Sequence, residues 1–227
     1  MVGIIGAMAL EVETLTKDLT DSRSETVCGI TFHLGKLAGK DVVLAVCGVG
    51  KVFAAICAQT MILRYNPEWI LNIGVAGALV PELQVGDMAI AVSAVQHDMD
   101  TSPIGDPVGL ISGINLVNLP CDEVLAETIA ACGVACGYRT VKGVIASGDQ
   151  FIADPNKKTW IRDTFDAIAC EMEGAAIVHT CYAAGVKCGV IRSISDSLTG
   201  DGMDFEAFKY LAASHSSTVV KLLVSKL

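Results

Sequence analysis

Three acidic residues follow apolar segments of the sequence, where an unpaired charge is costly. Glu11 comes after the apolar N-terminal run, Glu173 comes after "AIACEM", and Asp196 ends "VIRSISD". A carboxylate in apolar surroundings has to be paired, hydrogen-bonded or used in chemistry. Each acid alone could cap a helix or compensate a helix dipole. Three of them at one edge of a sheet would instead suit general acid and general base catalysis.

The elements that must position these acids alternate between strand and helix along the chain. Strand-like apolar segments are predicted at 2–8, 25–48, 68–79, 85–100, 141–152, 166–172 and 187–196, and helical periodicity at 9–19, 49–66, 121–133, 154–165, 173–185 and 204–227. This alternation predicts a three-layer α/β fold, in which a mostly parallel or mixed sheet is flanked by helices. Ligands of such sheets bind beyond the carboxyl ends of strands. With 227 residues and no internal repeat, the chain is expected to form a single domain over 1–227.

The composition argues against several classes of partner. The net charge is −9, so neither nucleic acid nor an anionic membrane surface is expected to bind, since both need basic patches. Apolar residues make up 52% of the chain, yet we find no uninterrupted apolar run long enough to span a bilayer. The start, "MVGIIGAMALEVE", lacks the basic region of a signal peptide. Nine cysteines without a C-x-x-C pair predict mostly buried, reduced thiols in a cytoplasmic protein.

Two motifs that could bind a cofactor or a metal depart from the patterns those sites require. "CGVGKVFAA" lacks both the Ser or Thr that follows the lysine of a phosphate loop and the third glycine of a dinucleotide-binding turn. Gly48 and Gly50 are expected instead to form a tight turn that lets the backbone approach a ligand. "HDMD", from His97 to Asp100, has no second cluster of metal ligands and is expected to order its loop. The sequence therefore indicates no cofactor and no metal.

Seven segments together resemble a known family. "IGAMALEVE", "CGVGKVFAA", "NIGVAGAL", "VGDMAIA", "SGDQFI", "CEMEGAA" and "RSISDS" resemble, in this order, the motifs of the bacterial 5′-methylthioadenosine/S-adenosylhomocysteine nucleosidases of the nucleoside phosphorylase family. The resemblance covers nearly the whole chain. It implies a nucleoside phosphorylase-like fold with a partly barrel-like sheet, and hydrolysis of the N-glycosidic bond of a 5′-thio-substituted adenosine. It also implies a homodimer, which the apolar composition favours.

The resemblance implies a role for each matching residue. Asp196 would be the general acid at purine N7, Glu11 would activate the attacking water, and Glu173 would hold the ribose hydroxyls. The other implied substrate-binding residues are Met8, Val49 and Ile104 around the 5′ substituent, some of them from a partner subunit, Phe151 and Ile152 at adenine, Met172 at the ribose, Arg192 close to the water and Glu173, and Ser195.

Elementary chemistry supports this set of acids independently. Breaking an N-glycosidic bond builds positive charge on the ribose and negative charge on the departing base. A proton at N7 improves the leaving group, a carboxylate near the ribose stabilises the cation, and the water needs a base on the opposite face of the sugar. Glu171, two residues before Glu173, is expected to have a supporting role such as pairing with an arginine.

Two departures from the family pattern concern the pocket. Val75 stands where the family often has a serine, so a hydroxyl contact near the water or ribose is missing. The segment "QHDMDTSPIGDPVGLISGIN" contains no Phe or Tyr, although this loop is aromatic-rich in the family. We expect a 5′ pocket of altered size and an unchanged class of reaction.

Three alternative functions remain open at this point. A nucleoside phosphorylase would need a site for the phosphate dianion, but only Arg192 lies at a strand end and Glu11 would repel phosphate. A related hydrolase could act on 5′-deoxyadenosine or on an aminofutalosine-type nucleoside with the same acids. A nucleoside-binding protein without activity would be expected to lack Asp196 or Glu11, and both are present.

Overall fold

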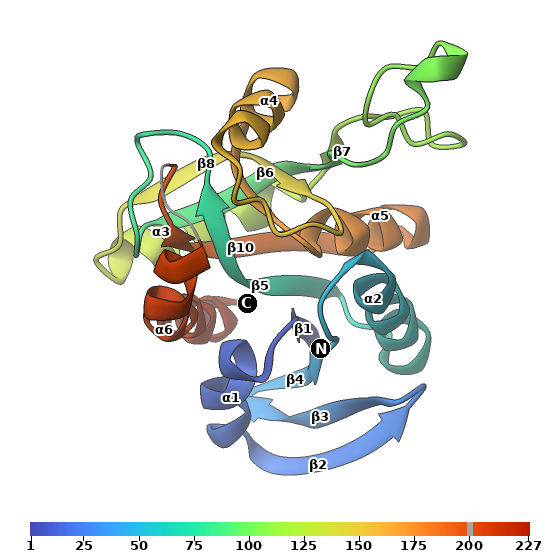
Figure 1. The fold of residues 1–227 in the computed structure, drawn as a ribbon. Helices are drawn as coiled ribbons and strands as arrows, with labels where there is room; N and C mark the ends of the chain where they lie inside the picture. Colours follow the sequence, from blue (N-terminus) through green and yellow to red (C-terminus); the bar gives the residue numbers. More distant parts are fainter. Residues whose placement is uncertain (199–201) are drawn as a thin grey trace.

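The computed structural model describes residues 1–198 and 202–227. Within these residues, ten strands form one mixed sheet (Figure 1). The strands are β1 (Val2–Gly6), β2 (Thr20–Val27), β3 (Ile30–Leu37), β4 (Lys40–Val46), β5 (Trp69–Ala78), β6 (Met88–Gln96), β7 (Leu119–Pro120), β8 (Thr140–Ser147), β9 (Ala167–Glu171) and β10 (Lys187–Asp196). The expected α/β class with a partly barrel-like sheet is confirmed.

The barrel-like part arises because five strands close on one another. β5 pairs with β10, β10 with β6, β6 with β8, β8 with β9, and β9 returns to β5. β1 pairs with the first half of β5, and β4, β3 and β2 extend the sheet outward from β1. β5 and β10 are buried along nearly their whole length, as expected for strands covered on both faces, and for that reason they appear in the sequence as continuous apolar runs.

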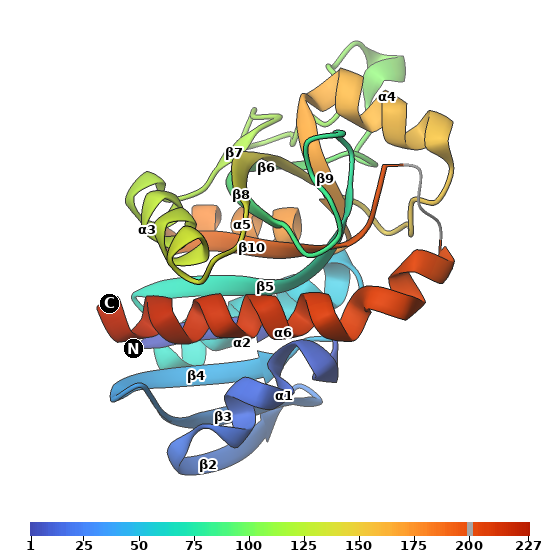
Figure 2. The same ribbon diagram turned by 90° about the vertical axis from the view of Figure 1, so that its left-hand side faces the viewer.

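Helices cover both sides of this sheet. They are α1 (Ala9–Lys17), α2 (Lys51–Tyr65), α3 (Glu123–Ala135), α4 (Pro155–Phe165), α5 (Gly174–Ala184) and α6 (Gly202–Lys226), with a short 3-10 helix, η1 (Ser102–Ile104). α1, α3 and α6 lie together on one side, and α2 and α5 pack against each other on the opposite side (Figures 1 and 2). α4 packs against β8 and β9. None of the helices in the described part of the chain is long and apolar enough to cross a bilayer.

Local sequence patterns predicted most helices and strands correctly, and β2 is the main exception. The start of α4 is as predicted, because Asp154 caps it by accepting a hydrogen bond from the Asn156 N–H at 3.0 Å and Pro155 is its first residue. β2 begins at Thr20, five residues before the predicted strand at Glu25. Its residues are mostly exposed, because β2 is an edge strand paired only with β3, and such a strand needs no alternating apolar pattern.

Candidate active site

A single pocket collects the ends of several strands. It lies where β1, β5, β9 and β10 end and is completed by the segments after β4 and β8 and by α6. Its lining residues are Ala7, Met8, Glu11, Val49, Val75, Ala76, Gly77, Gln150, Phe151, Ile152, Cys170, Glu171, Met172, Glu173, Ser195, Asp196 and Phe205. The three acids expected to act in chemistry therefore share one pocket, although the sequence separates them widely.

Glu11 is fixed from two sides in this pocket. It lies in the first turn of α1, where its Oε2 accepts hydrogen bonds from the backbone N–H of Ala7 at 2.7 Å and of Met8 at 2.9 Å. Its Oε1 accepts from the N–H of Val75 on β5 at 3.2 Å. Burial raises the pKa of Glu11, and the three backbone donors and the Arg192 charge only partly oppose that rise. A carboxylate with a raised pKa is a better proton acceptor than an exposed glutamate.

Serines of α6 hold the backbone around Glu11. Ser217 donates its hydroxyl hydrogen bond to the Glu11 carbonyl at 3.2 Å, and Ser216 donates to the Gly74 carbonyl at 3.0 Å. A Cβ at Gly74 would lie 2.6 Å from Glu11 Oε1, so glycine at this position is required for the carboxylate to lie over β5.

Glu173 follows β9 and stands at the N-cap position of α5, without a capping hydrogen bond from its side chain within the described part of the chain. Its Oε1 accepts a hydrogen bond from the Gly50 N–H at 2.8 Å, at the start of α2. Burial and the neighbouring Glu171 charge raise the pKa of Glu173 to about 8. The backbone at Gly50 thus approaches a carboxylate of the protein itself, whereas the sequence predicted an approach to a ligand. Glu173 is therefore set to exchange hydrogen bonds with a hydroxyl-bearing ligand in either protonation state near neutral pH.

Asp196 ends β10 and lies beside Gly77 of β5. Its Oδ1 accepts a hydrogen bond from the Ser195 hydroxyl at 3.0 Å, and its Oδ2 accepts from the Lys158 ammonium at 3.1 Å. A Cβ at Gly77 would lie 2.7 Å from Asp196 Oδ2. Gly74 and Gly77 are three residues apart on β5, so Glu11 and Asp196 lie over points about 10 Å apart on that strand. Both carboxylates line the same pocket.

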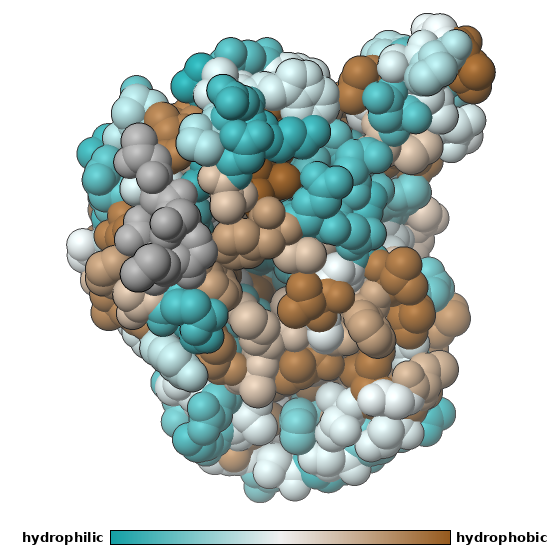
Figure 3. Space-filling model, viewed as in Figure 1, coloured by the Kyte–Doolittle hydropathy of each residue, from teal (hydrophilic) through white to brown (hydrophobic). Residues whose placement is uncertain are grey.

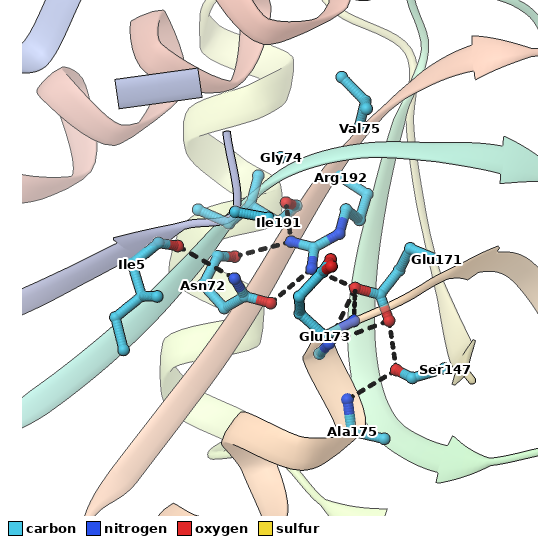
Figure 4. A network of polar contacts seen from close by, with 12 residues as sticks. Ile5, Asn72, Gly74, Val75, Ser147, Glu171, Glu173, Ala175, Ile191 and Arg192 are labelled. Carbon is cyan, nitrogen blue, oxygen red and sulfur yellow. Dashed lines mark hydrogen bonds and ion pairs between the residues drawn. The ribbon is translucent and has the colours of Figure 1, made fainter. Parts of the chain in front are cut away.

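Glu171 and Arg192 form a buried ion pair next to Glu173 (Figure 4). Glu171 also accepts hydrogen bonds from the Ser147 hydroxyl and from the backbone N–H of Glu173 and Gly174. Burial acts to raise the pKa of Glu171, but the Arg192 guanidinium and these donors outweigh it and hold that pKa below its usual value. The expected pairing of Glu171 with an arginine is therefore confirmed.

Two of the expected substrate-binding residues do not reach the pocket of their own chain. Arg192 is buried behind the acids, where it donates hydrogen bonds to Glu171 and to the side chain of Asn72. Its charge partly opposes the rise that burial causes in the pKa of Glu11 and of Glu173. Ile104 lies in η1 with 81% of its surface exposed, on the loop that projects away from the body of the molecule (Figure 1).

Aromatic residues close the outer side of the pocket. Phe151 is half exposed, and its ring meets the ring of Phe205 edge-on at 5.4 Å. Phe205 belongs to α6 and was not predicted from the sequence, because a helix pattern gives no sign that its first turns meet a distant loop. Cys170 also lines the pocket, and burial raises the pKa of its thiol to about 12. That thiol is therefore uncharged at neutral pH.

The loop that follows β6 is tied to the start of α2. Lys51 Nζ donates to Asp98 Oδ1 at 2.6 Å and to Gln96 Oε1 at 3.1 Å. Asp98 Oδ2 accepts from the Asp149 N–H at 2.9 Å, and Asp149 accepts from the Lys51 N–H at 2.7 Å. The expected polar network is therefore formed by Asp98, which positions the segment that carries Gln150 to Ile152, whereas both ring nitrogens of His97 are buried without a hydrogen-bond partner among the described residues.

Fold and pocket together define a member of the phosphorylase superfamily, whose family model matches residues 1–225. Within it, the chain belongs to the family of 5′-methylthioadenosine/S-adenosylhomocysteine nucleosidases. It is 38% identical over 228 residues to the nucleosidase of Shewanella oneidensis, an alignment that covers 100% of this chain and 97% of the relative.

Two solved structures share this fold. The nucleosidase of Neisseria meningitidis in complex with methylthio-immucillin-A superimposes with a TM-score of 0.95 at 32% identity and covers 100% of this chain and 99% of that one. A futalosine hydrolase of Helicobacter pylori superimposes with a TM-score of 0.94 at 34% identity and covers 100% and 97%.

Proposed function

We propose that this protein hydrolyses the N-glycosidic bond of 5′-methylthioadenosine and S-adenosylhomocysteine, releasing adenine and a 5-thio-substituted ribose. The observation that carries the proposal is the convergence of Glu11, Glu173 and Asp196 in one pocket. The relatives from Shewanella oneidensis and Neisseria meningitidis, both named as nucleosidases for these two substrates, support it.

Asp196 is assigned to the leaving group. In its protonated form it gives a proton to adenine N7 while the C1′–N9 bond breaks and its electron pair returns to the purine. Adenine then leaves as a neutral base. One well-placed general acid contributes about 10²–10⁴-fold to a rate. The position of Asp196 at the end of β10, between the Ser195 hydroxyl and the Lys158 ammonium, supports this role.

Glu11 and Glu173 are assigned to the ribose side. Glu11 takes a proton from water as the water oxygen bonds to C1′, which its raised pKa and its three backbone donors suit. Glu173 holds the ribose hydroxyls, and Met172 packs beside it on the same wall. When ionised, Glu173 also favours the positive charge that develops on the sugar.

The remaining lining residues divide between the two ends of the substrate. Phe151, Ile152 and Ser195 are assigned to adenine, and Met8 and Val49 to the 5′ substituent. Phe205 meets Phe151 edge-on and covers the same opening. Arg192 supports the acids from behind and does not contact substrate in this proposal.

We also propose that the protein is a homodimer in the cytoplasm. Apolar side chains gather on the outer face of α2, where Val52, Phe53 and Ile56 are each more than 40% exposed (Figure 3). Val49, just before α2, lines the pocket and is itself 51% exposed. A partner packed on this face would lie beside the pocket, and its projecting loop could bring Ile104 to the 5′ end.

One alternative keeps the same chemistry and changes the substrate. Because a futalosine hydrolase is among the similar structures, an aminofutalosine-type nucleoside is a second candidate substrate. Phosphorolysis is less favoured, because every charged residue among the described pocket-lining side chains is an acid. A phosphate dianion would meet repulsion there.

The test is adenine release from 5′-methylthioadenosine, S-adenosylhomocysteine, 5′-deoxyadenosine and an aminofutalosine-type nucleoside, each with and without phosphate. Release from the first two without phosphate is the expected result. A strict requirement for phosphate would overturn hydrolysis. Preference for the last nucleoside would replace the substrates and leave the mechanism in place.

A further inference from the structure

A lysine ammonium lies completely buried against the carboxylate assigned as general acid. Lys158 comes from the first turn of α4, and its side chain is 0% exposed. Nζ donates a hydrogen bond to Asp196 Oδ2 at 3.1 Å and another to the Ser197 carbonyl at 2.9 Å. A buried ammonium is costly unless it is paired and hydrogen-bonded. The fold therefore accepts this cost at one specific place, behind Asp196.

We propose that Lys158 is a positioning residue for Asp196, and this inference rests on the function proposed above. The ammonium holds Oδ2, and the Ser195 hydroxyl holds Oδ1. Rotation of the carboxyl group is thereby restricted, and its face toward the pocket is set. Lys158 is not among the residues that line the pocket, so it acts through Asp196 and not on the substrate.

The charge of Lys158 has a second consequence for the reaction. When Asp196 gives its proton to N7, a carboxylate forms at Asp196 in a site with little water. The adjacent ammonium stabilises that carboxylate, so the proton transfer that accompanies cleavage of the C1′–N9 bond becomes more favourable. A neutral donor in the place of Lys158 could orient the carboxyl group but could not supply this electrostatic stabilisation.

The neighbouring residue offers a matched control. Lys157 belongs to the same helix and is partly exposed, with its ammonium 3.8 Å from the centre of the Trp160 ring. Lys157→Met and Lys158→Met remove the same charge by the same substitution one residue apart. Only the second removes the hydrogen bond to Asp196.

The experiment measures kcat and KM against pH with two substrates, 5′-methylthioadenosine and p-nitrophenyl 5-methylthioriboside, whose leaving group needs no proton. Lys158→Met should lower kcat for the nucleoside about 10- to 100-fold, a part of the whole contribution of a general acid, with little change in KM. The high-pH limb of its pH–kcat profile should move to higher pH. The p-nitrophenyl substrate should be hydrolysed at nearly the wild-type rate, and Lys157→Met should match the wild type throughout.

Two further variants keep the test decisive. Lys158→Gln retains an N–H donor without the charge and should lose activity on the nucleoside alone, so the comparison stands even if Lys158→Met does not fold. Lys158→Met added to Asp196→Asn should cause no further loss, because both act in one step. Equal losses on both substrates, or additive losses in the double variant, would overturn the inference. If the proposed function itself were wrong, the result would be a different one, because the unchanged protein would then release no adenine.

Discussion

Glu171 and Arg192 form an ion pair in which the two side chains are only 3% and 2% exposed, and Glu171 itself lines the pocket. The pair joins the end of β9 to the middle of β10. Asn72 extends it to β1, because its amide donates to the Ile5 carbonyl at 3.0 Å while its oxygen accepts from Arg192. These side chains thus form a connected polar network next to Glu173, inside an otherwise apolar barrel.

Removing one partner of this pair should destabilise the whole protein. Glu171→Gln leaves the Arg192 charge buried without its carboxylate, which costs about 3–5 kcal/mol. For a chain of this length that is a fall in Tm of roughly 10 °C, measured by thermal unfolding. Glu13→Gln, which breaks the exposed pair with Lys17, is the control and should change stability by less than about 1 kcal/mol. Equal effects of the two would mean that the buried pair is not important for stability.

Asp196→Asn should nearly abolish turnover without unfolding the protein. An amide cannot give N7 a proton, so adenine release should fall about 10²–10⁴-fold. The measurement is initial rate with 5′-methylthioadenosine, with the far-ultraviolet circular dichroism spectrum as the check on folding. A rate near that of the wild type would remove Asp196 from the leaving-group role.

Glu11→Gln should separate binding from hydrolysis. The amide keeps the size of the side chain but cannot take a proton from water, so turnover should fall to a similar degree while the substrate still binds. Calorimetric titration with 5′-methylthioadenosine should give an affinity close to the KM of the wild type. Loss of binding together with rate would show that Glu11 holds the substrate and does not activate water.

The raised pKa of Glu173 predicts a pH-dependent stability. A carboxyl group whose folded pKa is about 8, against about 4.3 when unfolded, binds its proton more tightly in the folded state. Its contribution to stability is full below about pH 4 and is lost as pH rises toward 8. Glu173→Gln removes this loss, so its Tm should exceed that of the wild type by at least about 3 °C at pH 8.5 and by little at pH 4.5. A constant difference across that range would contradict the shift.

The dimer proposal makes a direct prediction about mass. Light scattering at micromolar concentration should give twice the chain mass of 23.7 kDa. Phe53→Asp places a charge on the exposed apolar face of α2 and should shift the protein toward the monomer. Leu211→Asp, which changes an exposed apolar residue on α6, is the control. A wild-type monomer would remove the proposed contribution of Ile104 from a partner.

The sequence by itself determined the order of the elements and the positions of the acids. Helical and strand periodicities are local, and so is the cap formed by Asp154 and Pro155, because each depends on residues a few positions apart. Glu11, Glu173 and Asp196 could be recognised because acids after apolar strands are unusual and because their surrounding motifs resemble a known family. β2 could not be predicted in full, since an exposed edge strand carries no apolar alternation.

The tertiary structure alone decided what each acid touches. Lys158 meets Asp196, Gly50 meets Glu173 and Arg192 meets Glu171 across separations of 38, 123 and 21 residues. These contacts depend on the register of β5, β9 and β10 and on closure of the barrel, and a shift of one residue would turn every side chain of a strand to its other face. Ile104 and Phe205 show the same limit, because where a loop or a long helix meets the rest of the fold follows from packing and not from the local pattern.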